Sequence, residues 1–97
     1  MTDRMEDALL QVKVEYEDCL DALKELGPYY APKRVSEEDY KAIMNRAYGH
    51  LVQLAVFMQS VEDERERCRC PENYRLWGEA HWYKDEAQRL YDRQKED

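Results

Sequence analysis

The sequence predicts an all-α protein: a three-helix up-down-up bundle with helices over about residues 3–26, 37–67 and 71–91. Apolar residues recur in alternating steps of three and four along each segment, which places them on one helical face. The two connections carry glycine or proline, residues that end helices. A chain of 97 residues fits one domain, residues 1–97, with one modest core.

The first predicted helix runs from about Thr2 or Asp3 to Leu26. Gly27 then supplies a residue that tolerates a left-handed conformation, and Pro28 cannot continue the helix. The apolar stripe of this helix consists of Met5, Leu9, Val12, Tyr16, Cys19, Leu23 and Leu26. We expect this stripe to face the core.

Residues 27–35 form the first connection. Its two prolines favour extended backbone, and Lys33 with Arg34 makes it locally basic. Tyr29 and Tyr30 are expected to cover the end of the bundle. The alternative is that they are exposed contact residues on a loop.

The second predicted helix has a well-marked start. Ser36 can accept hydrogen bonds from the free N–H groups of the first turn, and Asp39 follows at capping-box spacing. The acidic residues 37–39 suit the positive end of the helix dipole. We therefore expect a helix from residue 37, ending near residue 67 in mixed charges that form a solvated end.

The middle of this helix, residues 51–61, is the most apolar part of the chain. Its main stripe consists of Tyr40, Met44, Ala47, Leu51, Leu54, Met58 and Val61. Val52 and Val56 add a second stripe, and Gly49 leaves room for a close neighbour. Because the apolar arc exceeds half the circumference, the helix needs neighbours on at least two sides. We expect self-association through this arc or through exposed parts of the third helix.

The third predicted helix begins at Pro71, directly after Cys68-Arg69-Cys70, and runs to about Tyr91 with fraying polar residues behind it. Its stripe consists of Leu76, Ala80, Tyr83, Ala87 and Leu90. Trp82 falls on another side of the helix, where an exposed tryptophan is a candidate binding contact. The alternative is that its ring lies against a neighbouring chain or a loop.

Composition narrows the function classes. The net charge of −7 argues against direct nucleic-acid binding, which needs clustered Lys and Arg, and it suits a partner with a basic surface. Gln53 and Gln59 interrupt the longest apolar run, so no membrane span is expected. The first residues lack an export signal, and an odd number of cysteines is typical of a reducing compartment, so we expect a cytoplasmic protein.

No catalytic motif or cofactor site is recognisable, and an enzyme is not expected. Cys68 and Cys70 form one dense pair, whereas a zinc site needs four convergent ligands. Two acidic pairs, Glu15 with Asp18 and Asp63 with Glu66, have the spacing by which some helical hydrolases hold magnesium. Pairs of this kind are common in acidic chains, so a metal-dependent hydrolase remains only an alternative.

The outward half of the first helix is the candidate binding surface. It combines carboxylates with two apolar residues one turn apart, and Trp82 is the additional contact on the third helix. The predicted partner-binding residues are Asp7, Leu10, Val14, Glu17, Asp18, Asp21, Glu25 and Trp82. Carboxylates on successive turns lie about 5–6 Å apart, comparable to phosphates along a nucleic-acid strand. The other interpretation is a solvated face.

The leading functional hypothesis is a small, acidic, non-enzymatic protein-binding module. It would act stoichiometrically, as an inhibitor or adaptor, on a basic and even nucleic-acid-binding protein surface, by mimicking the phosphate backbone. The alternative is an assembly subunit that forms an obligate helical oligomer, with a homodimer as the simplest form. Salt should weaken the first kind of contact and have little effect on the second.

Overall fold

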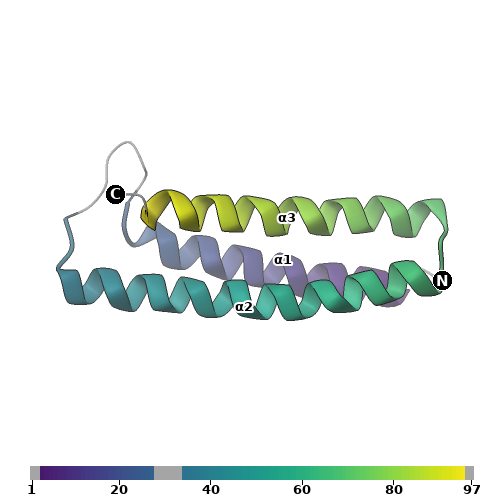
Figure 1. The fold of residues 1–97 in the computed structure, drawn as a ribbon, viewed down its shortest axis with the longest axis horizontal. Helices are drawn as coiled ribbons and strands as arrows, with labels where there is room; N and C mark the ends of the chain where they lie inside the picture. The colour runs from purple at the N-terminus through teal and green to yellow at the C-terminus, as the bar shows by residue number, and fades with distance from the viewer. Residues whose placement is uncertain (1–2, 28–33, 96–97) are drawn as a thin grey trace.

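The computed structural model describes residues 3–27 and 34–95. Within these ranges the chain forms three α-helices and no strand: α1 (Asp3–Lys24), α2 (Glu37–Arg67) and α3 (Pro71–Lys95). The prediction of an all-α chain with three helices is therefore confirmed. The helices lie side by side along the long axis of a body measuring 48 × 21 × 17 Å (Figure 1).

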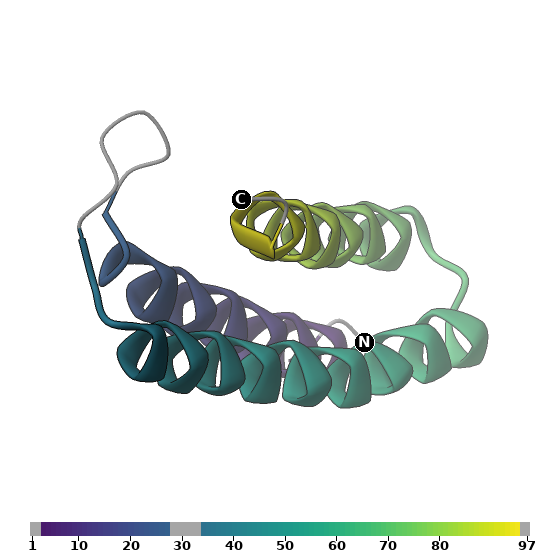
Figure 2. The same cartoon turned by 60° about the vertical axis from the view of Figure 1, so that its left-hand side comes forward.

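The chain reverses direction at each connection, as Figures 1 and 2 show. Two contacts show that α1 and α2 run in opposite directions. Glu25, near the end of α1, pairs with Arg46 of α2, whereas the earlier Glu15 contacts the later His50. Each helix packs against both others. The 31 residues of α2 make it the longest helix, and α1 and α3 share its inner side.

The end of α1 comes two residues before the predicted Leu26. The last turn tightens there, because Leu26 N–H donates to the carbonyl of Leu23 at 3.0 Å and Gly27 N–H to that of Lys24 at 2.9 Å. These bonds span three residues and replace the four-residue bonds of an α-helix. Gly27 has a φ of 82°, as expected for the residue after a helix end.

The predicted start of α2 is confirmed. Ser36 is its N-cap: Asp39 N–H donates to Ser36 Oγ at 3.1 Å. The predicted functions of Tyr29, Tyr30 and Lys33, and of the boundary residues Thr2 and Pro28, fall outside the described residues.

The predicted end of α3 near Tyr91 is wrong, because the helix continues to Lys95. Two contacts hold the extra turn. The hydroxyl of Tyr40 on α2 donates to the carbonyl of Gln94 at 3.0 Å, and the ammonium of Lys95 lies 5.6 Å from the centre of the Tyr91 ring. Arg, Gln and Lys are also good helix formers, so the polar sequence does not end the helix.

The predicted stripes supply most of the core. All three helices contribute apolar side chains, and Cys19 is fully buried among them. The largest fully buried side chains are Met5, Val12, Cys19, Leu54, Val61 and Asn73. In the described part of the chain, no helix combines the length and the apolar run that crossing a bilayer requires.

Asn73 is the polar exception in this core. Its side-chain amide donates to the carbonyls of Cys68 at 2.9 Å and Glu64 at 3.5 Å, which joins the start of α3 to the end of α2. Its Oδ1 is buried without a hydrogen-bond partner among the described residues. The amide therefore fixes the connection between the two helices at the expense of one unsatisfied acceptor.

The second apolar stripe of α2 is not covered. Val52 and Val56 are 44% and 56% exposed on the side of α2 that faces away from the core. Tyr48 beside them is 56% exposed and also borders α3, because its ring centre lies 6.1 Å from that of Tyr91. The close neighbour expected at Gly49 is absent from the described structure, because a Cβ placed there would meet nothing within 4 Å. We call Tyr48, Val52 and Val56 the outer stripe of α2.

Candidate functional site

Most of the predicted binding face of α1 points away from the bundle, but Asp18 is partly buried beside His50 of α2. Leu10 and Val14 are 58% and 45% exposed, large fractions for apolar side chains. Asp7, Glu17 and Asp21 are exposed beside them. Because all of these residues belong to one helix, the face is convex.

Two of the acidic residues on this face have cationic partners within the chain. Asp21 Oδ1 lies 3.7 Å from Lys24 Nζ, and both side chains remain largely exposed. Glu25 pairs with Arg46 of α2, also at the surface. Such exposed pairs are weak and exchange readily with a partner's cations. The face of α1 therefore keeps its acidic character.

Trp82 lies at the junction of α3 and α1. Its ring is 56% exposed, and its centre lies 5.9 Å from that of Tyr16 on α1 and 5.3 Å from that of Tyr83. The Tyr16 and Tyr83 rings are themselves 4.9 Å apart. One side of Trp82 thus belongs to an aromatic cluster between two helices, and the rest remains accessible.

A group of ligand-type side chains joins α1 to α2. His50 Nδ1 lies 2.7 Å from Glu15 Oε2, and the side chains of Glu15 and His50 are only 17% and 28% exposed. Asp18 stands one turn further along α1, and the ligand atoms of all three residues lie within 4.8 Å of one another. Two carboxylates and one imidazole form a donor set that divalent transition metals accept.

The sequence identified two members of this group but not the third. Glu15 and Asp18 are three residues apart, whereas His50 comes from another helix 32 residues later. The sequence carried one signal for His50, its position on the flank of the apolar stripe of its helix. Which residues of α1 it meets depends on how the two helices pack, and helical periodicity does not give that register. The His50–Glu15 hydrogen bond also serves a structural purpose, since it links the two helices.

A second histidine–carboxylate pair links α2 to α3. Glu62 Oε1 accepts hydrogen bonds from Trp77 Nε1 and His81 Nε2, each at 2.8 Å. These two bonds, His81 first, hold the pKa of Glu62 below its ordinary value. The guanidinium of Arg65 also lies 4.5 Å from the centre of the Trp77 ring. These hydrogen bonds link α2 to α3, and Glu62 Oε1 already accepts from two donors.

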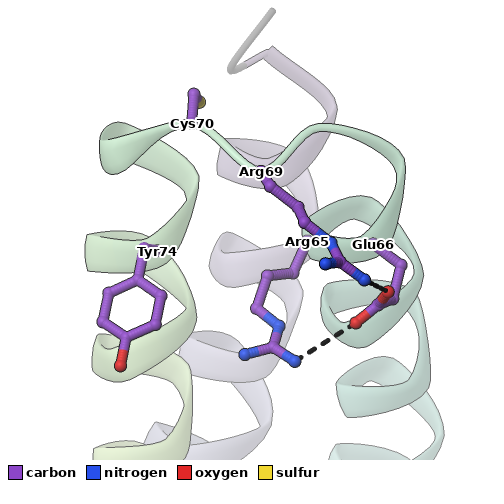
Figure 3. A pocket seen from close by; sticks show the side chains of 5 residues that line it. All are labelled: Arg65, Glu66, Arg69, Cys70 and Tyr74. Carbon is purple, nitrogen blue, oxygen red and sulfur yellow. Dashed lines mark hydrogen bonds and ion pairs between the residues drawn. The ribbon is translucent and has the colours of Figure 1, made fainter.

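The turn between α2 and α3 forms an open pocket of about 260 Å³. Figure 3 shows Arg65, Glu66 and Arg69 on one side, Tyr74 on the other, and Cys70 at the turn itself. Both arginines already pair with Glu66, at 3.2 Å for Arg65 and 2.6 Å for Arg69. The pocket therefore presents largely neutralised arginines and is a weak candidate for binding an anion.

The three cysteines occupy different environments. Burial raises the pKa of Cys19 to about 11, so this thiol stays protonated in the core. Asn73 N–H lies 3.4 Å from Cys70 Sγ, and this bond is the main cause that lowers the pKa of Cys70. Among the described residues, none of the cysteines joins a metal-ligand group with other Cys, His, Asp or Glu side chains. The Cys70 thiol therefore ionises more readily than that of Cys19.

Comparison with protein-family models, with curated proteins and with solved structures finds no match to this chain. The functional evidence for this chain therefore lies in its own surfaces. Three are available: the acidic face of α1, the Glu15–Asp18–His50 group and the outer stripe of α2.

Proposed function

We propose that the chain is a non-enzymatic protein-binding module that acts stoichiometrically, as an inhibitor or adaptor, on a basic protein surface. The outer face of α1 is the binding surface. The observation that carries the proposal is the exposure of Leu10 and Val14 between the carboxylates of Asp7, Glu17 and Asp21. Apolar side chains half exposed inside an acidic face are typical of a contact surface with charge around it.

The chemistry of this face defines its partner. The carboxylates would attract a surface rich in Lys and Arg, speed the encounter and fix its orientation. Leu10 and Val14 would then lose water against the partner and slow dissociation. A nucleic-acid-binding protein has such a basic surface, so a phosphate-mimicking inhibitor is the sharpest form of the proposal. The expected cytoplasmic location belongs to the same proposal.

Charge reversal tests the proposal. The tagged chain is used as bait in an extract of its native host, and proteins retained at low salt are eluted with a rising salt gradient. We expect Asp18→Lys with Asp21→Lys to abolish retention, because like charges then meet across the contact. Retention that is equal in the variant and the parent would remove the proposal.

Two controls make this test specific. Asp85→Lys with Asp92→Lys changes the net charge equally on exposed positions of α3 and should leave retention unchanged. Because Asp18 also stands beside the Glu15–His50 pair, a second variant, Glu17→Lys with Asp21→Lys, avoids that group. Both α1 variants should lose the partner while their helix content by circular dichroism stays that of the parent.

A second candidate function is an assembly subunit that forms a helical oligomer. It is favoured by one observation, the exposure of Tyr48, Val52 and Val56 on the outer stripe of α2. A contact through this stripe is apolar, so added salt should leave it nearly unchanged, in contrast to a contact through α1. Sedimentation of the pure chain at low and high salt distinguishes the two kinds of contact.

A further inference from the structure

The middle of the outer side of α2 is exceptional in this chain because it carries no charge. Charged residues make up 38% of the sequence, yet residues 47–61 contain no Asp, Glu, Lys or Arg. His50 also lies within this range and can carry a charge when protonated. Its side chain contacts Glu15 of α1 and therefore faces away from the outer stripe. About four turns of exposed helix are therefore available to an uncharged contact.

Beyond this uncharged region, the outer side of α2 carries charges at symmetric distances from Val52: Lys41 and Asp63 come first, and the exposed Glu38 and Glu66 follow at fourteen residues on either side. Lys41 and Asp63 are both exposed, and each lies eleven residues from Val52, one toward either end of α2. Asn45 and Gln59 lie seven residues from Val52, and Tyr48 and Val56 four. At roughly 100° per residue, all of these positions fall within an arc of about 80° on the outer side of the helix.

This pattern is complementary to itself when two copies of α2 lie antiparallel with their Val52 residues opposite each other. Tyr48 then faces Val56 of the second copy, and Lys41 faces its Asp63. A two-fold axis repeats every contact, so Lys41 meets Asp63 at both ends of the pair. Glu38 then faces Glu66, whose charge Arg65 and Arg69 offset within its own chain. A parallel arrangement would place Lys41 against Lys41 and Asp63 against Asp63, which is repulsive.

Net charge points to the same surface. Two copies of a chain with a charge of −7 repel one another, and the repulsion is least where neither surface is charged. The acidic face of α1 is the opposite case. The intrachain partners of the two end residues leave them accessible: Lys41 Nζ lies 3.5 Å from Glu37, with both side chains mostly exposed, and Asp63 accepts one bond from Gln59.

We propose that the outer side of α2 binds a second copy of the chain in an antiparallel, two-fold symmetric contact centred on Val52. The contact deepens the second candidate function, because it specifies which surface assembles and in which register. It uses no acidic residue of α1, so the proposed binding of a basic partner is independent of it.

Sedimentation equilibrium of the full chain tests the contact, with concentrations up to roughly 500 µM so that even a weak dimer is populated. We expect a dimer for the parent chain and a monomer for Val52→Asp with Val56→Asp, since four carboxylates would then meet at the axis. Both positions are exposed, so helix content should be retained. A parent chain that stays monomeric throughout, or a dimer that survives the double variant, overturns the proposal.

A charge exchange tests the register. Lys41→Asp places two carboxylates opposite each other at each end, and Asp63→Lys places two ammonium groups there. Each single variant should weaken dimerisation about tenfold or more. The double variant Lys41→Asp with Asp63→Lys keeps the net charge of the parent and restores opposite partners, so dimerisation should recover.

Matched and cross controls complete the design. Lys13→Asp, at an exposed position of α1, changes the net charge as Lys41→Asp does and should leave the dimer intact. Failure of the double charge exchange to recover would refute the antiparallel register. The α1 variants should lose the basic partner but keep the dimer. That result would show that partner binding through α1 and dimerisation through α2 are independent.

Discussion

The inner and outer sides of α2 are equally free of charge over residues 47–61, yet they have opposite surroundings. On the inner side, Leu54 and Val61 are almost completely buried against α1 and α3. On the outer side, Val52 and Val56 stand about half exposed. Similar apolar side chains thus serve the core in one case and remain available for a contact in the other. Apolar character alone does not make a core position; a neighbouring helix does.

The largest expected effect tests that contrast directly. Leu54→Ala should lower the free energy of unfolding by about 2–5 kcal/mol, because it removes buried methyl groups and leaves a cavity. Val56→Ala should change it by no more than about 0.5 kcal/mol in the monomer. Urea denaturation, with Val52→Asp as a monomeric background, measures both. Equal losses at the two positions would mean that the outer stripe is packed inside the folded chain.

Asn73 is the converse of the outer valines, because it is polar and yet fully buried. Asn73→Ala removes the donor to the Cys68 carbonyl and should cost about 1–3 kcal/mol, because that buried acceptor loses its partner. Gln88→Ala is the matched change at an exposed amide of α3 and should be nearly neutral. Thermal denaturation measures both variants. A neutral result at Asn73 would indicate that its unpartnered Oδ1 offsets the bond it makes.

Gly49 tests whether the outer side of α2 has free space. A Cβ at this position meets nothing within 4 Å, and the same holds for Gly78 on α3. Each Gly→Ala change should therefore raise the free energy of unfolding by up to about 1 kcal/mol through helix propensity. Urea denaturation of the monomeric background measures both changes. A gain at Gly78 with a loss at Gly49 would show that α2 has a close neighbour within its own chain.

The smallest expected effect concerns Glu62, at the edge of the inner side, whose pKa lies below its ordinary value of 4.5. A lowered pKa in the folded state means that the contribution of Glu62 to stability is complete above pH 4.5. It is lost as the pH falls through the lowered value. Because this side chain is 36% exposed, solvent screening keeps the effect small.

Acid denaturation followed by circular dichroism measures this contribution. Glu62→Gln should flatten the dependence of stability on pH below 4.5, and Trp77→Phe, which removes one of the two donors, should flatten it in part. Identical acid profiles for Glu62→Gln and the parent chain would show that the hydrogen bonds from Trp77 and His81 contribute nothing to the pH dependence.

Local signals in the sequence predicted the helices well. Ser36 fixed the start of α2 because an N-cap acts within its own first turn. Gly27 likewise marked the end of α1 to within a few residues. The end of α3 was misplaced because Tyr40 holds it from another helix, and no local signal near Gln94 reports that bond.

The candidate sites divide in the same way. The acidic face of α1 could be predicted because all of its residues share one helix and one period. The Glu15–Asp18–His50 group and the Glu62–Trp77–His81 cluster could not, since each depends on the register between two helices. The burial of Asn73 was missed for a related reason. Polarity argues for exposure, and its partners are backbone carbonyls that a sequence does not display.

The sequence by itself determined that three amphipathic helices form, where they begin, and that acidic residues gather on the back of the first. These features follow from local hydrogen bonding and from helical periodicity, which act over a few residues. Only the tertiary structure decided that the second stripe of α2, Val52 and Val56, remained exposed while the main stripe became core. That choice depends on how three helices divide the available surface among themselves, because two neighbours cannot enclose an apolar arc as wide as that of α2.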